Sequence, residues 1–160
     1  MAEMVGGFLM PHLPTIPSGM LLDDPEVRER FYAAFDGITE RLRELEVDTV
    51  IIIGDDHYEC FGPGCIPSCL IGTGDVNMSD HVELLGMSKG LLPNNPALAR
   101  HILETGFDDG IDWSFAKYLG IDHSVAVPYT MTAKRIPGVA MIPVYLNDVV
   151  MPVIRSRRAA

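Results

Sequence analysis

One short run restricts the fold of this chain more than any other feature of its sequence. Residues 49–53, TVIII, are β-branched at every position and lead directly into Gly54, Asp55, Asp56 and His57. A strand that is apolar along its length, rather than at alternate positions, is typical of a parallel sheet covered on both faces. We therefore expect an α/β fold in which this strand carries polar groups to its carboxyl end, where ligands bind in such folds.

The segment before this run predicts another strand and a helix. Residues 4–10, MVGGFLM, form an apolar run closed by PHLP, which indicates a buried strand with His12 just past its carboxyl end. Asp24 followed by proline is a helix start signal, and apolar residues then recur at three- and four-residue steps. The order strand, helix, strand predicts a βαβ unit with a right-handed crossover, which would bring His12 and His57 to one edge of the sheet.

The rest of the chain continues the alternation of strands and helices. Asn95 and the proline after it predict a helix that ends at Gly106. The end of the chain, MPVIRSRRAA, carries three arginines and no closing apolar face, which predicts that the sheet continues beyond residue 160. We expect an α/β domain over residues 1–160, incomplete at its end, with a mostly parallel or mixed sheet and helices on both faces. Further strands are expected within 68–72, 111–123 and 138–147, and a surface loop or lid over 76–95.

Composition narrows the classes of partner. The formal net charge is −10, which argues against binding to a nucleic acid or to an anionic membrane surface, because both would repel the chain. Hydrophobic residues make up 48% of the chain and charged residues 21%, so a folded domain is expected rather than a disordered one. No apolar stretch approaches the roughly 18–20 residues of a membrane helix, and Glu3 replaces the basic flank of a signal peptide. These features predict a cytoplasmic protein.

The cysteines support the same compartment. The chain has three of them, Cys60, Cys65 and Cys69, an odd number that suits reduced thiols better than a disulfide framework. Their spacings of five and four residues are not the Cys-x-x-Cys pairs of structural zinc sites. We therefore expect small buried thiols rather than zinc ligands.

His12 and His57 are the main candidates for metal binding. Neutral imidazole is a common metal ligand, and two histidines at the ends of neighbouring strands can converge on one ion. Two histidines and one carboxylate would leave open positions on Fe(II). Asp55, Asp56 and Glu59 lie near His57 in sequence, but neighbouring residues rarely chelate together, so an acidic ligand from elsewhere is expected, with Asp55 or Asp56 orienting an imidazole. The alternative is that these are polar loop residues bonded to the backbone.

His123 is the candidate for acid–base chemistry. Its side chain titrates near neutrality, and the neighbouring Asp122 could tune it. The alternative is a half-buried histidine bonded to a backbone carbonyl. His81, in a polar loop, and His101, on a helix face, show no pattern that indicates a function.

Three stretches together resemble a known family. GGFLMPHLP, IIIGDDHYECF and IDHSVAVPYTM, in this order and at these separations, are similar to the class III extradiol ring-cleaving dioxygenases, and the trailing IPVYLN is similar to the next strand of that fold. The resemblance implies that His12 and His57 are ligands of a non-haem Fe(II) and that His123 is the acid–base histidine. It also implies a glutamate as third ligand and a further histidine, both from a later part of the domain that is not matched here.

The implied activity is extradiol cleavage of a catecholic ring with O2 during the degradation of aromatic compounds. The resemblance further implies a homo-oligomer or association with a small partner subunit, and it implies that these 160 residues alone lack full activity. Two alternatives remain open: a non-catalytic metal-binding homologue, and a zinc-dependent hydrolase on the same scaffold. We expect loops at 13–20, 58–68 and 124–132 to line the substrate pocket.

Overall fold

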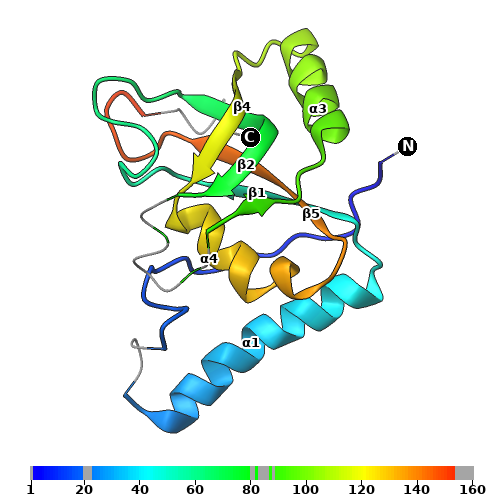
Figure 1. Cartoon of the computed structure of the whole chain (residues 1–160), viewed down its shortest axis with the longest axis vertical. Helices are drawn as coiled ribbons and strands as arrows, with labels where there is room; N and C mark the ends of the chain where they lie inside the picture. The colour runs from blue at the N-terminus through cyan, green and yellow to red at the C-terminus, as the bar shows by residue number, and fades with distance from the viewer. Residues whose placement is uncertain (1, 20–22, 80–81, 83–86, 88, 154–160) are drawn as a thin grey trace.

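The computed structural model describes residues 2–19, 23–79, 82, 87 and 89–153. Within them a five-stranded sheet is combined with three α-helices and one short 3-10 helix (Figure 1). In chain order the elements are α1 (Pro25–Glu44), β1 (Thr49–Gly54), β2 (Cys69–Met78), β3 (Leu91–Leu92), α3 (Pro96–Asp108), β4 (Ser114–Ile121), α4 (His123–Met131), η1 (Ala133–Arg135) and β5 (Ala140–Leu146).

The sheet is mixed. β1 pairs with β5 in parallel, and β5 pairs with β2 in antiparallel orientation. β2 also pairs with β4 in parallel orientation. The short β3 pairs with β2 in antiparallel orientation. The expected α/β class with a mixed sheet is therefore confirmed, and the predicted strands within 68–72, 111–123 and 138–147 are present as β2, β4 and β5.

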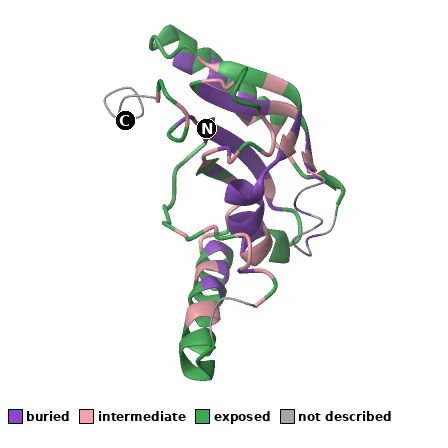
Figure 2. Cartoon of the chain, turned by 90° about the vertical axis from the view of Figure 1, so that its left-hand side faces the viewer, coloured by how far each residue is buried: buried purple, intermediate pink, exposed green. Residues whose placement is uncertain are grey.

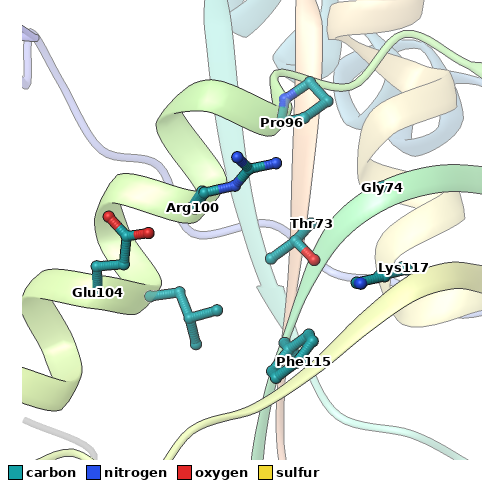
Figure 3. A pocket seen from close by; sticks show the side chains of 8 residues that line it. Thr73, Gly74, Pro96, Arg100, Glu104, Phe115 and Lys117 are labelled. Atoms are coloured by element: carbon teal, nitrogen blue, oxygen red, sulfur yellow. The ribbon is translucent and has the colours of Figure 1, made fainter.

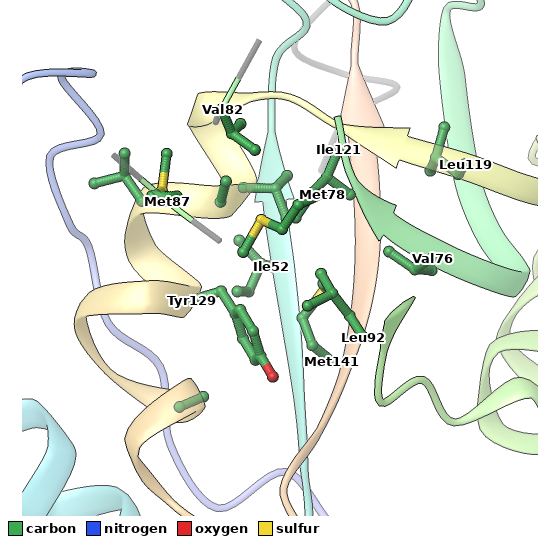
Figure 4. Close-up of a cluster of buried hydrophobic side chains, with 14 of the residues drawn as sticks. Ile52, Val76, Met78, Val82, Met87, Leu92, Leu119, Ile121, Tyr129 and Met141 are labelled. Carbon is green, nitrogen blue, oxygen red and sulfur yellow. The ribbon is translucent and has the colours of Figure 1, made fainter. Parts of the chain in front are cut away.

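Helices cover both faces of the sheet, as expected. On one face α4 and α1 enclose the larger core, in which many side chains are fully buried (Figure 4). On the other face α3 packs Ala99 and Leu103 against Ile71, Ile142 and Val144 of β2 and β5. Buried positions gather on β5 and α4, whereas much of α1 is exposed (Figure 2). The core therefore lies where β5, β2 and α4 meet.

The predicted helix starts are confirmed by their caps. The carboxylate of Asp24 accepts hydrogen bonds from the amides of Glu26 and Val27 at the start of α1. The side chain of Asn95 accepts one from the amide of Leu98 at the start of α3. The predicted end of α3 at Gly106 is wrong, because the helix continues to Asp108. Gly106 serves packing instead, since a Cβ there would overlap the indole of Trp113.

The prediction of a strand over residues 4–10 is wrong. The segment is irregular, and the side chains of Met4 and Leu9 are fully or almost fully exposed. It contains Gly6 and Gly7, which have low strand propensity, and it makes no ladder with β1, whose strand partner in the described residues is β5. The predicted βαβ unit is therefore not formed, because none of the described residues before α1 belongs to a strand.

The prediction that β1 is covered on both faces is also wrong for the described part of the chain. Ile52 is buried against the larger core, but Ile51 and Ile53 are 45% and 64% exposed. They lie on the face that α3 covers, because their partners in β5 are Ile142 and Val144, which α3 buries. α3 packs over β5 and β2 and leaves this side of β1 open.

Two further loop predictions are corrected. The expected lid at 76–95 is in part regular structure, since residues near both of its ends belong to β2 and β3 and bury Val76 and Leu92 in the core. His81 lies outside the described residues. Residues 124–132, expected as a loop, form most of α4. Two valines and Pro128 disfavour a helix here, but burial of Val125 and Val127 overrides that local preference. The arginine-rich end of the chain beyond residue 153 also lies outside the described residues.

The three cysteines are free thiols in different surroundings. Cys65 is exposed, whereas Cys69 is buried and its pKa is raised by burial to about 11. Burial, with the nearby charges of Asp122 and Asp56, also raises the pKa of Cys60, whose thiol donates to the carbonyl of Gly120. Cys69 matches the expectation of a small buried thiol, whereas that expectation is wrong for Cys65, which is exposed.

No helix among the described residues combines the length and the apolar character that a bilayer crossing requires.

The contact between Gly106 and Trp113 makes a prediction about stability. Glycine to alanine in a helix interior normally adds up to about 1 kcal/mol of stability. At Gly106 the added methyl group overlaps the indole, and overpacking costs about 1–3 kcal/mol, so Gly106→Ala should be net destabilising. Urea unfolding followed by circular dichroism measures the change, with Thr105→Ala on the exposed side of α3 as the control. A more stable Gly106→Ala variant would contradict this packing.

Candidate metal centre

Three histidines from separate parts of the chain meet at one point. His12 comes from the irregular amino-terminal segment, His57 follows β1, and His123 is the first residue of α4. The ring centroids of His57 and His123 are 4.3 Å apart, and those of His12 lie 5.3 Å and 5.9 Å from them. One ring nitrogen of each histidine lies within 4.8 Å of one nitrogen of each of the others. The three residues singled out in the sequence are thus brought together.

Gly54 allows the end of β1 to approach α4 so closely. A Cβ at Gly54 would overlap the hydroxyl of Ser124 and press on the side chain of Val125. With no side chain at this position, the backbone that leads to His57 lies directly against the first turn of α4. The glycine between the apolar run and the polar residues therefore sets the distance between His57 and His123.

The imidazole of His57 is held between two carboxylates. Its Nδ1 lies 3.2 Å from an oxygen of Asp122, and its Nε2 lies 3.3 Å from an oxygen of Asp55. Asp122 is fully buried, and it also accepts hydrogen bonds from the hydroxyls of Tyr145 (3.0 Å) and Ser124 (2.7 Å). A carboxylate so fixed is well suited to accept Nδ1–H and to leave Nε2 as the free nitrogen.

Asp55 lies between two of the imidazoles. Besides its contact with His57, its other oxygen is 3.8 Å from Nε2 of His12. Asp56 has a different role, because its carboxylate accepts hydrogen bonds from the amides of Cys60 and Phe61 and closes the turn after β1. Of the two aspartates considered for orienting an imidazole, the geometry brings Asp55 to the histidines and Asp56 to the backbone.

His123 is paired with Glu59 rather than with Asp122. Its Nδ1 lies 2.5 Å from one oxygen of Glu59, and its amide donates to the other at 3.2 Å. Burial lowers the pKa of His123, but the hydrogen bond and the charge of Glu59, with the charges of Asp122 and Asp55, outweigh it, so the pKa is raised overall. Asp122 therefore acts on His123 through its charge, whereas the imidazole that its carboxylate contacts is that of His57.

Sequence reasoning considered Glu59 only as a possible neighbour of His57. Its contact with His123 joins residues 64 positions apart, so no local pattern could indicate it. The backbone just before Glu59 turns sharply, because Tyr58 adopts the left-handed region with φ 64°. Glu59 follows this turn and contacts His123.

The donor set fits a divalent transition metal ion. With Nδ1 of His57 and of His123 facing carboxylates, each ring has Nε2 left to bind an ion or to exchange a proton with a bound molecule. Nε2 of His57 lies 3.3 Å from an oxygen of Asp55, so the two atoms are close enough to contact one shared cation. Glu59, Asp122 and His123 form a second group of suitable geometry. Hydrogen bonds already account for that group, so the cluster of His12, His57 and His123 is the better candidate.

An open pocket gives access to these rings. Its volume is about 510 Å³, and besides the three histidines it is lined by Met10, Pro11, Leu13 and Pro14. The apolar lining thus comes from the amino-terminal segment, which also carries His12, and His57 and His123 complete the lining. A small planar molecule with polar atoms on one edge matches this division in size and polarity.

The chain is similar to known proteins over most of its length. The family model described as the catalytic LigB subunit of aromatic ring-opening dioxygenase matches residues 6–160. The 2,3-dihydroxyphenylpropionate/2,3-dihydroxicinnamic acid 1,2-dioxygenase of Rhodococcus globerulus is 25% identical over 150 residues, which cover 93% of this chain and 46% of the relative. The enzyme of the same name from Escherichia coli (strain K12 / DH10B) is 24% identical over 143 residues, 89% of this chain and 44% of the relative.

The chain spans less than half the length of these curated relatives. The family match, by contrast, covers nearly the whole chain and includes all three histidines of the cluster. The chain belongs to the family of the catalytic LigB subunit of aromatic ring-opening dioxygenases.

Proposed function

We propose that the protein takes part in the Fe(II)-dependent extradiol cleavage of a catecholic ring with O2, in the degradation of aromatic compounds. The observation that carries this proposal is the convergence of His12, His57 and His123 on one open pocket, in a chain of this family. The relatives that match are named as dioxygenases of dihydroxylated aromatic acids, which supports a catechol as the substrate class.

In this proposal His12 and His57 hold the metal ion through their Nε2 atoms. Asp122 keeps the ring of His57 in the required tautomer, and Asp55 adds negative charge beside both rings. When bound, Fe(II) supplies open coordination positions for the two substrate oxygens and for O2. A set of two imidazoles and a carboxylate is the pattern expected for non-haem Fe(II) oxygenases.

His123 is proposed as the acid–base group. Its Nδ1 is held by Glu59, so Nε2 is available to accept a phenolic proton from a catechol in the pocket. The charge of Glu59 then stabilises the imidazolium, which later returns its proton as the ring opens. Both atoms of O2 enter the ring-opened product, so no external reductant is consumed. His123 is largely buried, with 7% of its surface exposed, although it also lines the pocket.

We further propose that residues 1–160 are part of a larger extradiol dioxygenase domain. Two observations support this. The matched relatives are more than twice as long as the matched region, and Ile51 and Ile53 present an apolar strip on an edge strand beside the site. Further polypeptide packed on that strip would bury it and could bring the glutamate that the family resemblance implies as third ligand.

The partners proposed are a small-molecule catechol and O2, with no nucleic acid and no membrane. The net charge of −10 supports the exclusion of polyanionic partners, and the free thiols support a cytoplasmic location. Assembly as a homo-oligomer or with a small partner subunit is proposed on the family resemblance alone.

A zinc-dependent hydrolase is the second candidate, because zinc prefers the same imidazole and carboxylate ligands. A non-catalytic metal-binding homologue is the third. Elemental analysis of protein purified without added metal separates iron from zinc. Oxygen uptake with a panel of catechols, after anaerobic loading with Fe(II), separates an enzyme from a binding module.

Metal binding by the 160-residue chain is the first test. Wild-type protein should bind one Co(II) ion, and His57→Ala should weaken binding by more than the roughly 10–100-fold that loss of an outer-sphere partner costs. His101→Ala is the matched control, because His101 is exposed on α3 outside the pocket. Titration followed by cobalt absorbance measures the affinities. Equal losses in both variants, or in neither, would contradict the site.

The role of His123 is tested by separating affinity from turnover. In the full-length enzyme, His123→Ala should leave metal affinity unchanged and lower kcat by about 10²–10⁴, as for loss of a general acid or base. Metal titration and the absorbance of the ring-opened product measure the two effects. If His123 were instead a metal ligand, His123→Ala would weaken metal binding as much as His57→Ala, and the acid–base role would fall.

The network behind His57 makes a prediction about Tyr145. Its hydroxyl donates to the carboxylate of Asp122 and accepts from the amide of the same residue. Tyr145→Phe should destabilise the fold by about 1–3 kcal/mol, because a buried N–H loses its partner. It should also weaken metal binding, by less than the 10–100-fold expected for loss of a direct orienting group.

The matched control is Tyr129→Phe, since Tyr129 is equally buried in the hydrophobic cluster of Figure 4. Thermal unfolding and Co(II) titration of both variants measure the effects. A Tyr145→Phe variant that binds Co(II) as tightly as Tyr129→Phe would show that the network does not orient His57.

A further inference from the structure

A second cavity lies away from the histidines, between α3 and the strands β2 and β4 (Figure 3). Its volume is about 700 Å³, larger than that of the histidine pocket, and the two share no lining residue. It opens on the face of the sheet that α3 covers, whereas His123 begins the helix on the other face. The chemistry proposed for the histidines does not use it.

A strand irregularity shapes this cavity. The register of β2 against β4 shifts between Gly72 and Asp75, so the backbone at Thr73 and Gly74 leaves the regular ladder. The side-chain amide of Asn94 fixes the shifted segment by donating to the carbonyls of Gly72 (3.2 Å) and Gly74 (2.7 Å). Close packing of the two strands also requires glycine at residue 74, because a Cβ there would overlap the carbonyl of Lys117.

Two basic side chains line the cavity from opposite sides. Arg100 reaches it from α3 and Lys117 from β4, with Thr73 between them (Figure 3). Within the described residues, neither cation is among the ion pairs with a carboxylate. Pro96, at the first position of α3, also lines the cavity, so the positive end of the helix dipole adds to the field. In a chain with net charge −10, this arrangement favours an anion.

The remaining walls restrict what kind of anion fits. Leu103 and Phe115 give the cavity an apolar side, and Phe115 is 51% exposed, so a planar ring can stack on its side chain. Glu104, one helical turn after Arg100, also lines the cavity and would repel a second negative charge. A cavity of this volume is within the usual range for one small ligand.

We propose that this cavity binds a small aromatic carboxylate as a monoanion. The carboxylate lies between Arg100 and Lys117, and the ring lies against Phe115 and Leu103. The proposal does not depend on the metal centre or on the proposed dioxygenase reaction.

Calorimetric titration of the EDTA-treated 160-residue chain tests the proposal, with benzoate as the probe. Benzoate should bind at least about tenfold more tightly than benzyl alcohol, which lacks the charge, and than inorganic phosphate, which lacks the ring. Arg100→Gln and Lys117→Gln should each raise the Kd for benzoate at least about threefold, the scale expected for a partly exposed ionic contact. Phe115→Ala should raise it as well.

Two controls locate the binding. Arg30→Gln makes the same change of charge on α1 and should leave the Kd unchanged, and so should His57→Ala. Loss of binding in His57→Ala would place benzoate in the histidine pocket and overturn the proposal. It would also be overturned by phosphate binding as tightly as benzoate, by an absence of benzoate binding at millimolar concentration, or by unchanged affinity in both Arg100→Gln and Lys117→Gln. Circular dichroism of each variant shows that it is folded.

Discussion

The buried carboxylate of Asp122 is the interaction on which the rest of the site depends. It accepts from Tyr145 of β5 and from Ser124 of α4, and it lies against Nδ1 of His57 after β1. Burying a carboxylate costs free energy unless its oxygens are hydrogen-bonded, and Asp122 has no exposed surface. Loss of any one of these contacts is therefore expected to weaken the others. One side chain thereby joins the ends of β1 and β4, the start of α4 and the middle of the sheet to the imidazole that faces the pocket.

Local patterns predicted the elements whose signals are local. α1 begins where Asp24 and the proline after it indicate, and β1 occupies the β-branched run, because caps and β-branched residues act on the backbone next to them. The meeting of the histidines was expected from sheet topology and the family resemblance. Asp55 was among the residues expected to orient an imidazole, and it does lie against His57 and His12. The pairing of Glu59 with His123 and that of Tyr145 with Asp122 were not expected, since these partners lie 64 and 23 residues apart. Only the fold creates such contacts.

The wrong predictions share a physical cause. The run at 49–53 has the composition of a strand covered on both faces, yet α3 covers β5 and β2 and leaves Ile51 and Ile53 exposed. Residues 4–10 have the apolar character of a strand but find no ladder partner. The composition of a segment indicates whether it is stable when buried. It does not indicate which other part of the protein buries it. Both errors are consistent with the proposal that further polypeptide completes this side of the domain.

The three imidazoles are not held equally firmly. His57 is fixed by Asp122 and His123 by Glu59, each through Nδ1 and each also through a backbone amide. His12 has only a 3.8 Å contact with Asp55 and comes from an irregular, largely exposed segment. A metal ion bound here would have to order that segment, and the conformational entropy lost would reduce the observed affinity. If further polypeptide covered the amino-terminal segment, as proposed, that cost would fall, and metal binding would be tighter than in these 160 residues alone.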